Sequence, residues 1–223
     1  MRRLDGAIVV LLLIVTVLSA AQTRREDEPF CDEKSAKKVE IADGDAAILG
    51  FSIGHATLKD VQAKLGNASV TRVSREEESD VSICYVSPAD GTVLVLYTGV
   101  MGGGEDITWF ALWSHEAAYP HASRCTPSKL VTRSLSTESG IRLGLTKEEF
   151  ERVVGRPTQN GPKSNKYNYL CRKRMTEDEI KSFKTENNWD VSKDPYFDRM
   201  SWIEAWYRDS TTSRIEIGAI ESY

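Results

Sequence analysis

The residues with the clearest capacity for chemistry are the four cysteines, Cys31, Cys84, Cys125 and Cys171. In an exported chain an even number of cysteines predicts disulfides, here two of them. A structural zinc site is the alternative, but such sites usually contain closely spaced pairs such as C-x-x-C, and this sequence has none. We therefore expect two disulfides and no metal ion.

Catalytic motifs are scarce in the chain. The zinc motif H-E-x-x-H and the phosphate-binding P-loop are missing from the sequence, whereas the nucleophile pattern G-x-S-x-G occurs once, at residues 50–54. The three histidines, His55, His115 and His121, are scattered, and the glycine run Gly102–Gly104 is predicted to be a hairpin loop. We expect no catalytic residue and no cofactor.

The N-terminal segment has the pattern of a secretory signal peptide. Arg2 and Arg3 precede an almost wholly apolar run over residues 7–18, and small residues follow it. We place the cleavage after Ala21, because Ser19 and Ala21 supply the small side chains that signal peptidase reads. The mature chain would then be secreted or periplasmic. An uncleaved anchor is the alternative, although a spanning helix needs about 20 apolar residues.

The charge of the chain argues against nucleic-acid binding. The sequence contains 29 Lys and Arg against 33 Asp and Glu, a formal net charge of −4, whereas nucleic-acid-binding surfaces are usually basic. No cysteine follows the apolar run at the position that a lipoprotein signal requires. We therefore predict no lipid anchor, and contact with a membrane stays open.

Two segments of the chain, 53–66 and 143–155, resemble each other. Each has a threonine, an acid three residues later, two apolar residues at i, i+4 and a terminal glycine. The corresponding pairs are Thr57 and Thr146, Asp60 and Glu149, Val61 and Phe150, Leu65 and Val154, and Gly66 and Gly155. The threonine and the acid form a capping box, the apolar pair gives one buried helix face, and the glycine ends the helix. We predict a short helix in each segment.

The cysteines occur in the same order in both halves, one before the helix and one in the strand after it. This order favours duplication, and we predict two α+β units at 28–122 and 123–223. Because duplication would copy a bond within each unit, we predict that Cys31 pairs with Cys84 and that Cys125 pairs with Cys171.

Antiparallel strands are expected after each helix. Runs rich in β-branched and aromatic residues predict strands at 81–86, 92–97, 107–113, 167–172, 201–207 and 214–220. A third capping box, Thr176 with Glu179, begins a predicted helix at 176–188, within an insertion at about 175–198. The fold class is α+β, with each short helical segment packed on one face of an antiparallel sheet.

The second half resembles a known repeat. The runs GLTKEEF (144–150), VGRP (154–157) and YNY (167–169) are similar to the repeat shared by the SmpA/OmlA group of outer-membrane assembly lipoproteins and by the tandem-repeat β-lactamase inhibitor proteins. The resemblance covers residues 140–220 well and 48–114 weakly. It implies a helical part against an antiparallel sheet, in a non-catalytic protein that binds other proteins. The chain lacks the lipid-attachment cysteine and has a long insertion, which leaves the partner unspecified.

Strand alternation predicts where a partner would bind. The apolar residues Ile203, Ala205, Ile215, Ile217 and Ala219 share one face, which should cover the helix. The opposite face carries Trp202, Glu204, Trp206, Arg214 and Glu216, and in the first half Trp109 and Trp113 share a face. Large aromatics among charges are typical of binding hot spots, and the inhibitor modules that the chain resembles bind through an open sheet face. The alternative is that the insertion or the other half covers these residues.

The first hypothesis is therefore a non-catalytic protein-binding module, either inhibitor-like or envelope-assembly-like. A carrier of a small hydrophobic ligand, an envelope stress or structural factor and an enzyme of unrecognised type are the alternatives. The sequence does not name the partner, which we expect to be another protein.

Overall fold

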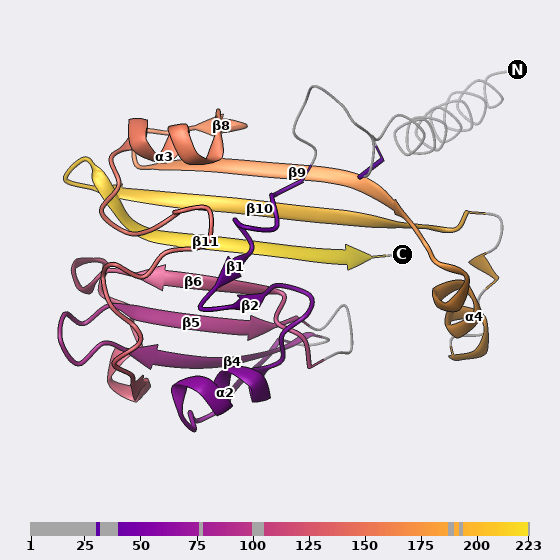
Figure 1. Cartoon of the computed structure of the whole chain (residues 1–223), viewed down its shortest axis with the longest axis horizontal. Helices are drawn as coiled ribbons and strands as arrows, with labels where there is room; N and C mark the ends of the chain where they lie inside the picture. Colours follow the sequence, from indigo (N-terminus) through magenta and orange to yellow (C-terminus); the bar gives the residue numbers. More distant parts are fainter. Residues whose placement is uncertain are drawn as a thin grey trace, which may run out of the picture.

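One large, mostly antiparallel sheet dominates the structure, a computed structural model that describes residues 30–31, 40–75, 78–99, 105–186, 190–191 and 194–222. The proposed signal peptide and the glycine run lie outside the described residues. In Figure 1 the strands run side by side, from β9 at the top to β4 at the bottom. The α+β class predicted from the sequence is confirmed.

The strands of the large sheet match the six predicted ones and add shorter pieces. They are β3 (Thr71–Arg75), β4 (Glu78–Val86), β5 (Val93–Thr98), β6 (Trp109–Trp113), β7 (Thr126–Pro127), β8 (Gln159–Asn160), β9 (Ser164–Arg174), β10 (Tyr196–Arg208) and β11 (Thr211–Ser222). Their order is β3-β4-β5-β6-β11-β10-β9-β8, with β7 beside β4 in parallel. A separate hairpin joins β1 (Ala47–Ile48) and β2 (Phe51–Ser52).

The two halves of the chain meet where β6 pairs with β11, with Ala111 opposite Glu216. The first half supplies β3 to β6 and the second half supplies β8 to β11, so both halves share one sheet. Each half ends in a strand that would otherwise leave an unpaired edge, and an unpaired edge invites pairing with another strand. The two units predicted from the sequence did not include this pairing of β6 with β11.

Both short helices begin at the predicted capping boxes. In α2 (Leu58–Leu65) the side chain of Thr57 accepts from the N–H of Asp60, and in α3 (Lys147–Val154) Thr146 accepts from Glu149. In each box the acid also accepts from the N–H of the threonine. The helices end at glycines with φ of +102° and +104°, where a side chain would strain the backbone.

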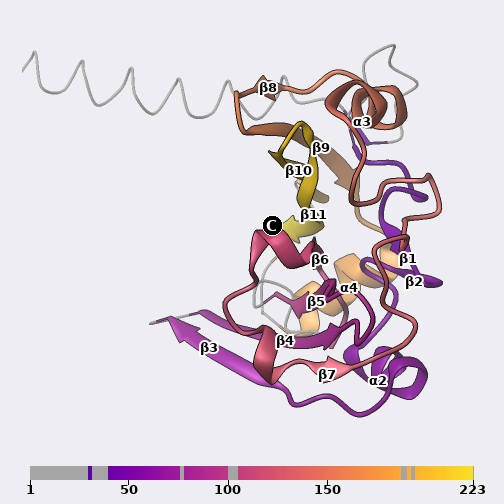
Figure 2. The ribbon, with the colours of Figure 1, turned by 90° about the vertical axis from the view of Figure 1, so that its left-hand side faces the viewer.

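The apolar residues of these helices face the core, as predicted. Val61 and Phe150 are fully buried, and Leu65 and Val154 nearly so. Figure 2 shows α2, α3 and the β1–β2 hairpin on one side of the sheet, and β3 reaching out toward the other. The main core lies under the helices and includes Tyr85, Phe110, Phe150 and Tyr167, each at most 1% exposed.

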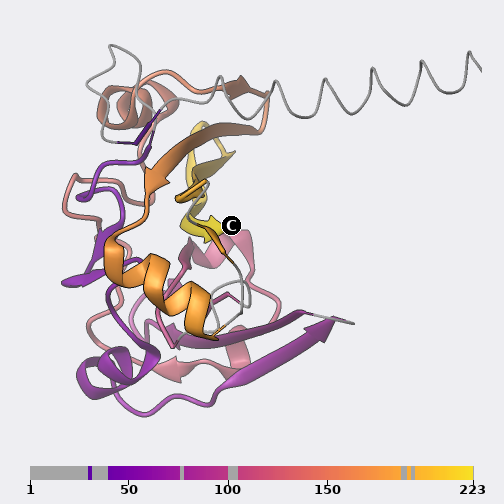
Figure 3. The same cartoon turned by 90° about the vertical axis from the view of Figure 1, so that its right-hand side faces the viewer.

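The insertion forms a helix, α4 (Glu177–Glu186), between β9 and β10. Its capping box is present, because the N–H of Thr176 donates to Glu179 Oε2 and the N–H of Glu179 donates to Thr176 Oγ1. The rings of Phe183 on α4 and Phe197 on β10 are 5.7 Å apart. In Figure 3 this helix stands at one end of the sheet, on the same side as α2.

The predicted disulfide pairing is wrong. The structure joins Cys31 to Cys171 and Cys84 to Cys125. The second bond forms because β7 follows Cys125 directly and pairs with β4, the strand of Cys84.

The first bond has a similar cause. Phe30 forms a parallel bridge with Arg172, and the N–H of Cys31 donates to the carbonyl of Arg172 at 3.0 Å. This contact brings Cys31 beside Cys171 on β9. Sheet neighbours therefore decide the pairing, and duplication of a bond within each half does not.

Candidate functional site

The seven residues predicted to bind a partner lie on the sheet face opposite α2 and α3. They are Trp109, Trp113, Trp202, Glu204, Trp206, Arg214 and Glu216, and each is partly exposed. Their strand neighbours Ile203, Ala205 and Ile215 point to the helix side and are fully buried, as alternation along a strand requires. The strand register places the seven residues in three rows that cross β6, β11 and β10. We call this surface the open face.

The first row consists of Trp113, Arg214 and Trp206. The guanidinium carbon of Arg214 lies 4.1 Å from the ring centroid of Trp113 and 3.9 Å from that of Trp206. Arg214 thus lies between two indole rings, and such cation–π contacts contribute about 0.5–1 kcal/mol each at exposed sites. The stack holds one cation and two indoles in defined positions.

The second row contains two carboxylates. Glu204 and Glu216 are direct cross-strand partners, and their side chains are only 18% and 16% exposed. Like charges that face each other across a strand pair are destabilising, so each carboxylate needs a cation. Nε of Arg214 donates to Glu216 Oε1 at 3.1 Å, and Nζ of Lys166 lies 3.3 Å from Glu204 Oε1. Each carboxylate therefore has one cation beside it, which approaches atom Oε1.

The third row consists of Trp109, Gly218 and Trp202. The indole of Trp202 lies over Gly218, because a Cβ at this glycine would be 2.2 Å from ring atom Cζ2. Trp109 stacks on Tyr97 of β5, with ring centroids 3.4 Å apart and nearly parallel planes. Burial raises the pKa of Tyr97 above its usual value, so its hydroxyl stays neutral under ordinary conditions.

The structure extends the open face by apolar residues that the sequence interpretation missed. Met200 pairs with Ile220 on one side and with Leu170 on the other. Met200 is 45% exposed and Leu170 is 42% exposed. The alternation contained the signal, because Met200 is two residues before Trp202 and shares its face. It was missed because the strand was predicted to begin at Ser201, whereas β10 begins earlier.

One end of the open face has a cover. The segment with η2 (His115–Ala117) and η3 (Ala122–Arg124) packs on β4, β5 and β6, around a small cluster that contains Val93 and Val95. The disulfide Cys84–Cys125 fastens this segment to β4, and Tyr119 contacts Trp113 at 5.3 Å between ring centroids.

The described part of the insertion does not cover the open face. Phe197, which contacts α4, shares the helix side of β10 with Arg199 and Ser201, because residues two apart on a strand point to the same face. Figures 2 and 3 place α4 away from the side to which β3 projects. Within the described ranges, the alternative that the insertion buries the two tryptophans of β10 is therefore not found.

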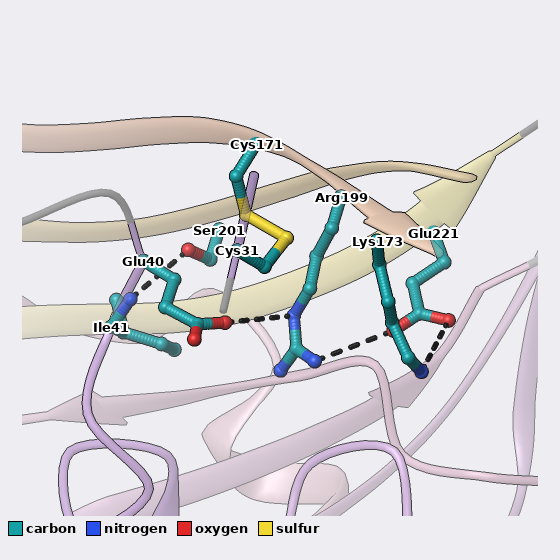
Figure 4. Close-up of a disulfide and its surroundings, with 8 residues drawn as sticks. All are labelled: Cys31, Glu40, Ile41, Cys171, Lys173, Arg199, Ser201 and Glu221. Atoms are coloured by element: carbon teal, nitrogen blue, oxygen red, sulfur yellow. Dashed lines mark hydrogen bonds and ion pairs between the residues drawn. A yellow bond between two sulfur atoms is a disulfide. The ribbon is translucent and has the colours of Figure 1, made fainter. Parts of the chain in front are cut away.

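A charged cluster marks the end of the helix side, next to the disulfide Cys31–Cys171 (Figure 4). Nε of Arg199 lies 3.5 Å from Glu40 Oε2, and its Nη1 donates to Glu221 Oε1 at 3.4 Å. Nζ of Lys173 donates to both oxygens of Glu221, at 3.0 and 3.2 Å. These opposite charges satisfy one another and hold the start of the described chain against the sheet.

A cavity of about 380 Å³ adjoins this cluster. Its lining consists of Ile53, Gly54, His55, Gly99, Asp106, Thr108, Lys173, Glu179, Arg199, Ala219, Ile220 and Glu221. Pockets for small hydrophobic ligands are lined mainly by apolar side chains, so this charged lining suits such a ligand poorly.

One group of possible metal ligands occurs in the part of the chain that the structure describes. There, Cys31, Glu40 and Cys171 are the one group with suitable ligand atoms close together. The two sulfurs are bonded to each other, and a metal ligand must be a thiolate. This group is therefore a disulfide with a neighbouring carboxylate.

No family model, curated protein or solved structure matches this chain. The resemblance to the SmpA/OmlA repeat stays a prediction. The two disulfides indicate an oxidising environment outside the cytoplasm. No helix among the described residues is long and apolar enough to cross a membrane.

Proposed function

We propose that this chain is an exported, non-catalytic protein-binding module and that the open face contacts the partner. The observation that carries the proposal is four tryptophans on one partly exposed sheet face, with Arg214 held between two of them. Tryptophan and arginine are enriched among the residues that dominate binding energy. Apolar side chains grouped on one accessible face and rimmed by polar residues are typical of interaction sites.

The geometry also lowers the cost of binding. A partner must normally order the flexible side chains that it contacts, at about 0.5–1.5 kcal/mol each. Trp113 and Trp206 are already held by Arg214, and Trp202 already rests on Gly218. Met200 and Leu170 add exposed apolar area beside them. The open face is therefore ordered before a partner arrives.

The proposal also covers how the chain is exported and which protein family it is related to. Residues 1–21 would direct export and be removed after Ala21, and the two disulfides agree with an oxidising destination. The chain would be a diverged tandem protein of the SmpA/OmlA-like kind without a lipid anchor. The partner could then be an enzyme that it inhibits or a protein of the cell envelope.

The double substitution Trp202→Ala, Trp206→Ala tests the proposal. The mature protein is immobilised, its partner is captured from periplasmic or culture extract and identified, and the affinity for the purified partner is measured by calorimetry. We expect a loss of about 100-fold or more, because hot-spot residues contribute at least about 2 kcal/mol each. Val153→Ala on α3 is the control, since Val153 is 38% exposed on the helix side.

Two results would contradict the proposal. If the double variant binds the partner with native affinity, the open face is not the site. If native mass spectrometry instead finds a small molecule bound to the purified protein and no protein partner is recovered, the carrier class replaces the binding module.

A further inference from the structure

We infer that the partner places a lysine or arginine side chain on the Glu204–Glu216 pair, beside apolar side chains that cover Met200 and Leu170. The inference rests on the proposed function and adds the chemistry of the partner segment. Charge complementarity at the centre of the open face is its basis.

The first step concerns the free acceptor atoms of the two carboxylates. Arg214 and Lys166 both approach atom Oε1 of their acidic partner. Within the described part of the chain, neither Oε2 atom accepts a hydrogen bond. Neither of these two atoms is fully buried. A carboxylate offers about four acceptor positions, so Glu204 and Glu216 can accept further N–H groups from a partner.

The second step concerns the two resident cations. The guanidinium of Arg214 is covered by an indole on each face, and its Nε and Nη2 point to Glu216. The N–H groups of Arg214 are therefore already engaged by Glu216. Lys166 is 43% exposed, and exposed ion pairs are weak. An arriving cation would displace Lys166 alone, whereas Arg214 stays in place.

The third step concerns the aromatic neighbours of Glu204. Trp202 and Trp206 precede and follow it by two residues on β10, so both indoles are on the same face as the carboxylate. A long basic side chain can lay its aliphatic stem on such rings and its charged end on the carboxylate. An acidic side chain at the same place would be repelled by both carboxylates.

The fourth step sets the spacing of the partner segment. Glu204 and Met200 are four residues apart on β10, which is about 13 Å along a strand. An extended partner segment with a basic residue and an apolar residue four positions apart would meet both. Leu170, opposite Met200 on β9, widens the apolar end of the site.

Defined peptides test this inference. The probe is acetyl-Leu-Thr-Ser-Thr-Arg-Thr-amide, and its control carries citrulline, which is nearly isosteric with arginine but neutral. Binding to the ¹⁵N-labelled mature protein is followed by the indole N–H signals, which Trp→Phe variants assign. We expect the arginine peptide to shift the signals of Trp202 and Trp206 and to bind about tenfold more tightly than the citrulline peptide.

Matched variants separate the charge of the site from its shape. Glu204→Gln should weaken the arginine peptide about tenfold and leave the citrulline peptide unchanged. Lys166→Met should strengthen the arginine peptide, because the competing cation is gone. Glu148→Gln, on the exposed surface of α3, should change neither. Equal binding of the two peptides, unchanged affinity in Glu204→Gln, or no shift at millimolar peptide overturns the inference.

The inference and the proposed function fail in different experiments. If the captured partner is lost by the double tryptophan variant but bound normally by Glu204→Gln, the open face binds protein without a basic anchor, and the inference alone falls. If the double tryptophan variant keeps its partner, both fall.

Discussion

The indole of Trp202 rests on Gly218, its cross-strand partner in the β10–β11 pair. A Cβ on Gly218 would lie 2.2 Å from Cζ2 and 2.4 Å from Cη2 of this ring. Any other residue would push the indole away from the sheet. The glycine therefore determines where the largest side chain of the third row lies.

Gly218→Ala should move the Trp202 indole and destabilise the protein. The added methyl overlaps the ring, and overpacking of this kind typically costs 1–3 kcal/mol, so we expect roughly that loss. The measurements are the free energy of unfolding in urea and the near-ultraviolet circular dichroism, which reports the environment of the indole.

A double-substitution cycle provides the control for this change. In a Trp202→Ala background the clash is absent, so Gly218→Ala should cost little or become slightly favourable through a less flexible unfolded chain. Equal costs in both backgrounds would mean that Gly218 does not position Trp202.

The disulfide pairing can be read directly. A non-reducing peptide map of the mature protein should contain one peptide pair with Cys31 and Cys171 and another with Cys84 and Cys125. The bonds span sequence separations of 140 and 41 residues. A peptide pair that joins Cys31 to Cys84 would contradict the fold described above.

Removal of each bond should destabilise the protein by a comparable amount. Chain entropy gives roughly 5 kcal/mol for Cys31–Cys171 and roughly 4 kcal/mol for Cys84–Cys125. The variants are paired Cys→Ala substitutions, compared by urea unfolding. The Cys84–Cys125 variant should also loosen the segment that covers Trp113, so amide exchange should rise across residues 115–125 while α3 keeps its protection. Uniform exchange across the chain would contradict this local role.

Phe150 should be the main contact of α3 with the sheet. Its side chain is fully buried, and its ring centroid lies 5.8 Å from that of Tyr167. Phe150→Ala should lower the free energy of unfolding by about 3–5 kcal/mol. Val153→Ala on the exposed side of the same helix should cost about 0.5 kcal/mol or less. A loss under about 1 kcal/mol for Phe150→Ala would mean that the helix does not pack as described.

The capping box of α3 should make stability depend on acid. The N–H of Thr146 donates to Glu149 Oε2 at 2.8 Å, and this bond to the backbone lowers the pKa of Glu149. A carboxyl with a lowered folded pKa stabilises the fold above its unfolded pKa, which is about 4.3, and this contribution is lost as the pH falls through the folded pKa. Glutamine can keep the bond without titrating.

Glu149→Gln should therefore resemble the native protein near neutral pH and lose less stability on acidification. The check is urea unfolding at a series of pH values between neutrality and pH 3. If both proteins lose stability in parallel over the acid range, Glu149 contributes nothing through its charge.

Local structure could be predicted well from the sequence. Thr57 and Thr146 begin helices because a hydroxyl and an acid three residues later satisfy free N–H groups of the first turn, which requires no distant contact. The alternation that buries Ile203 and Ile215 likewise depends on strand geometry alone. The same rule placed the tryptophans of β10 opposite the helices.

Long-range pairing was decided only by the tertiary structure. No local sequence pattern predicts that β6 pairs with β11, that Phe30 pairs with Arg172, or that the segment after η3 pairs with β4. The disulfide bonds followed these pairings, because a bond forms between the cysteines that the folded sheet brings together. The sequence by itself determined caps, strands and the two faces. The sheet order determined which cysteines meet and which tryptophans remain open, because both depend on contacts between residues distant in the chain.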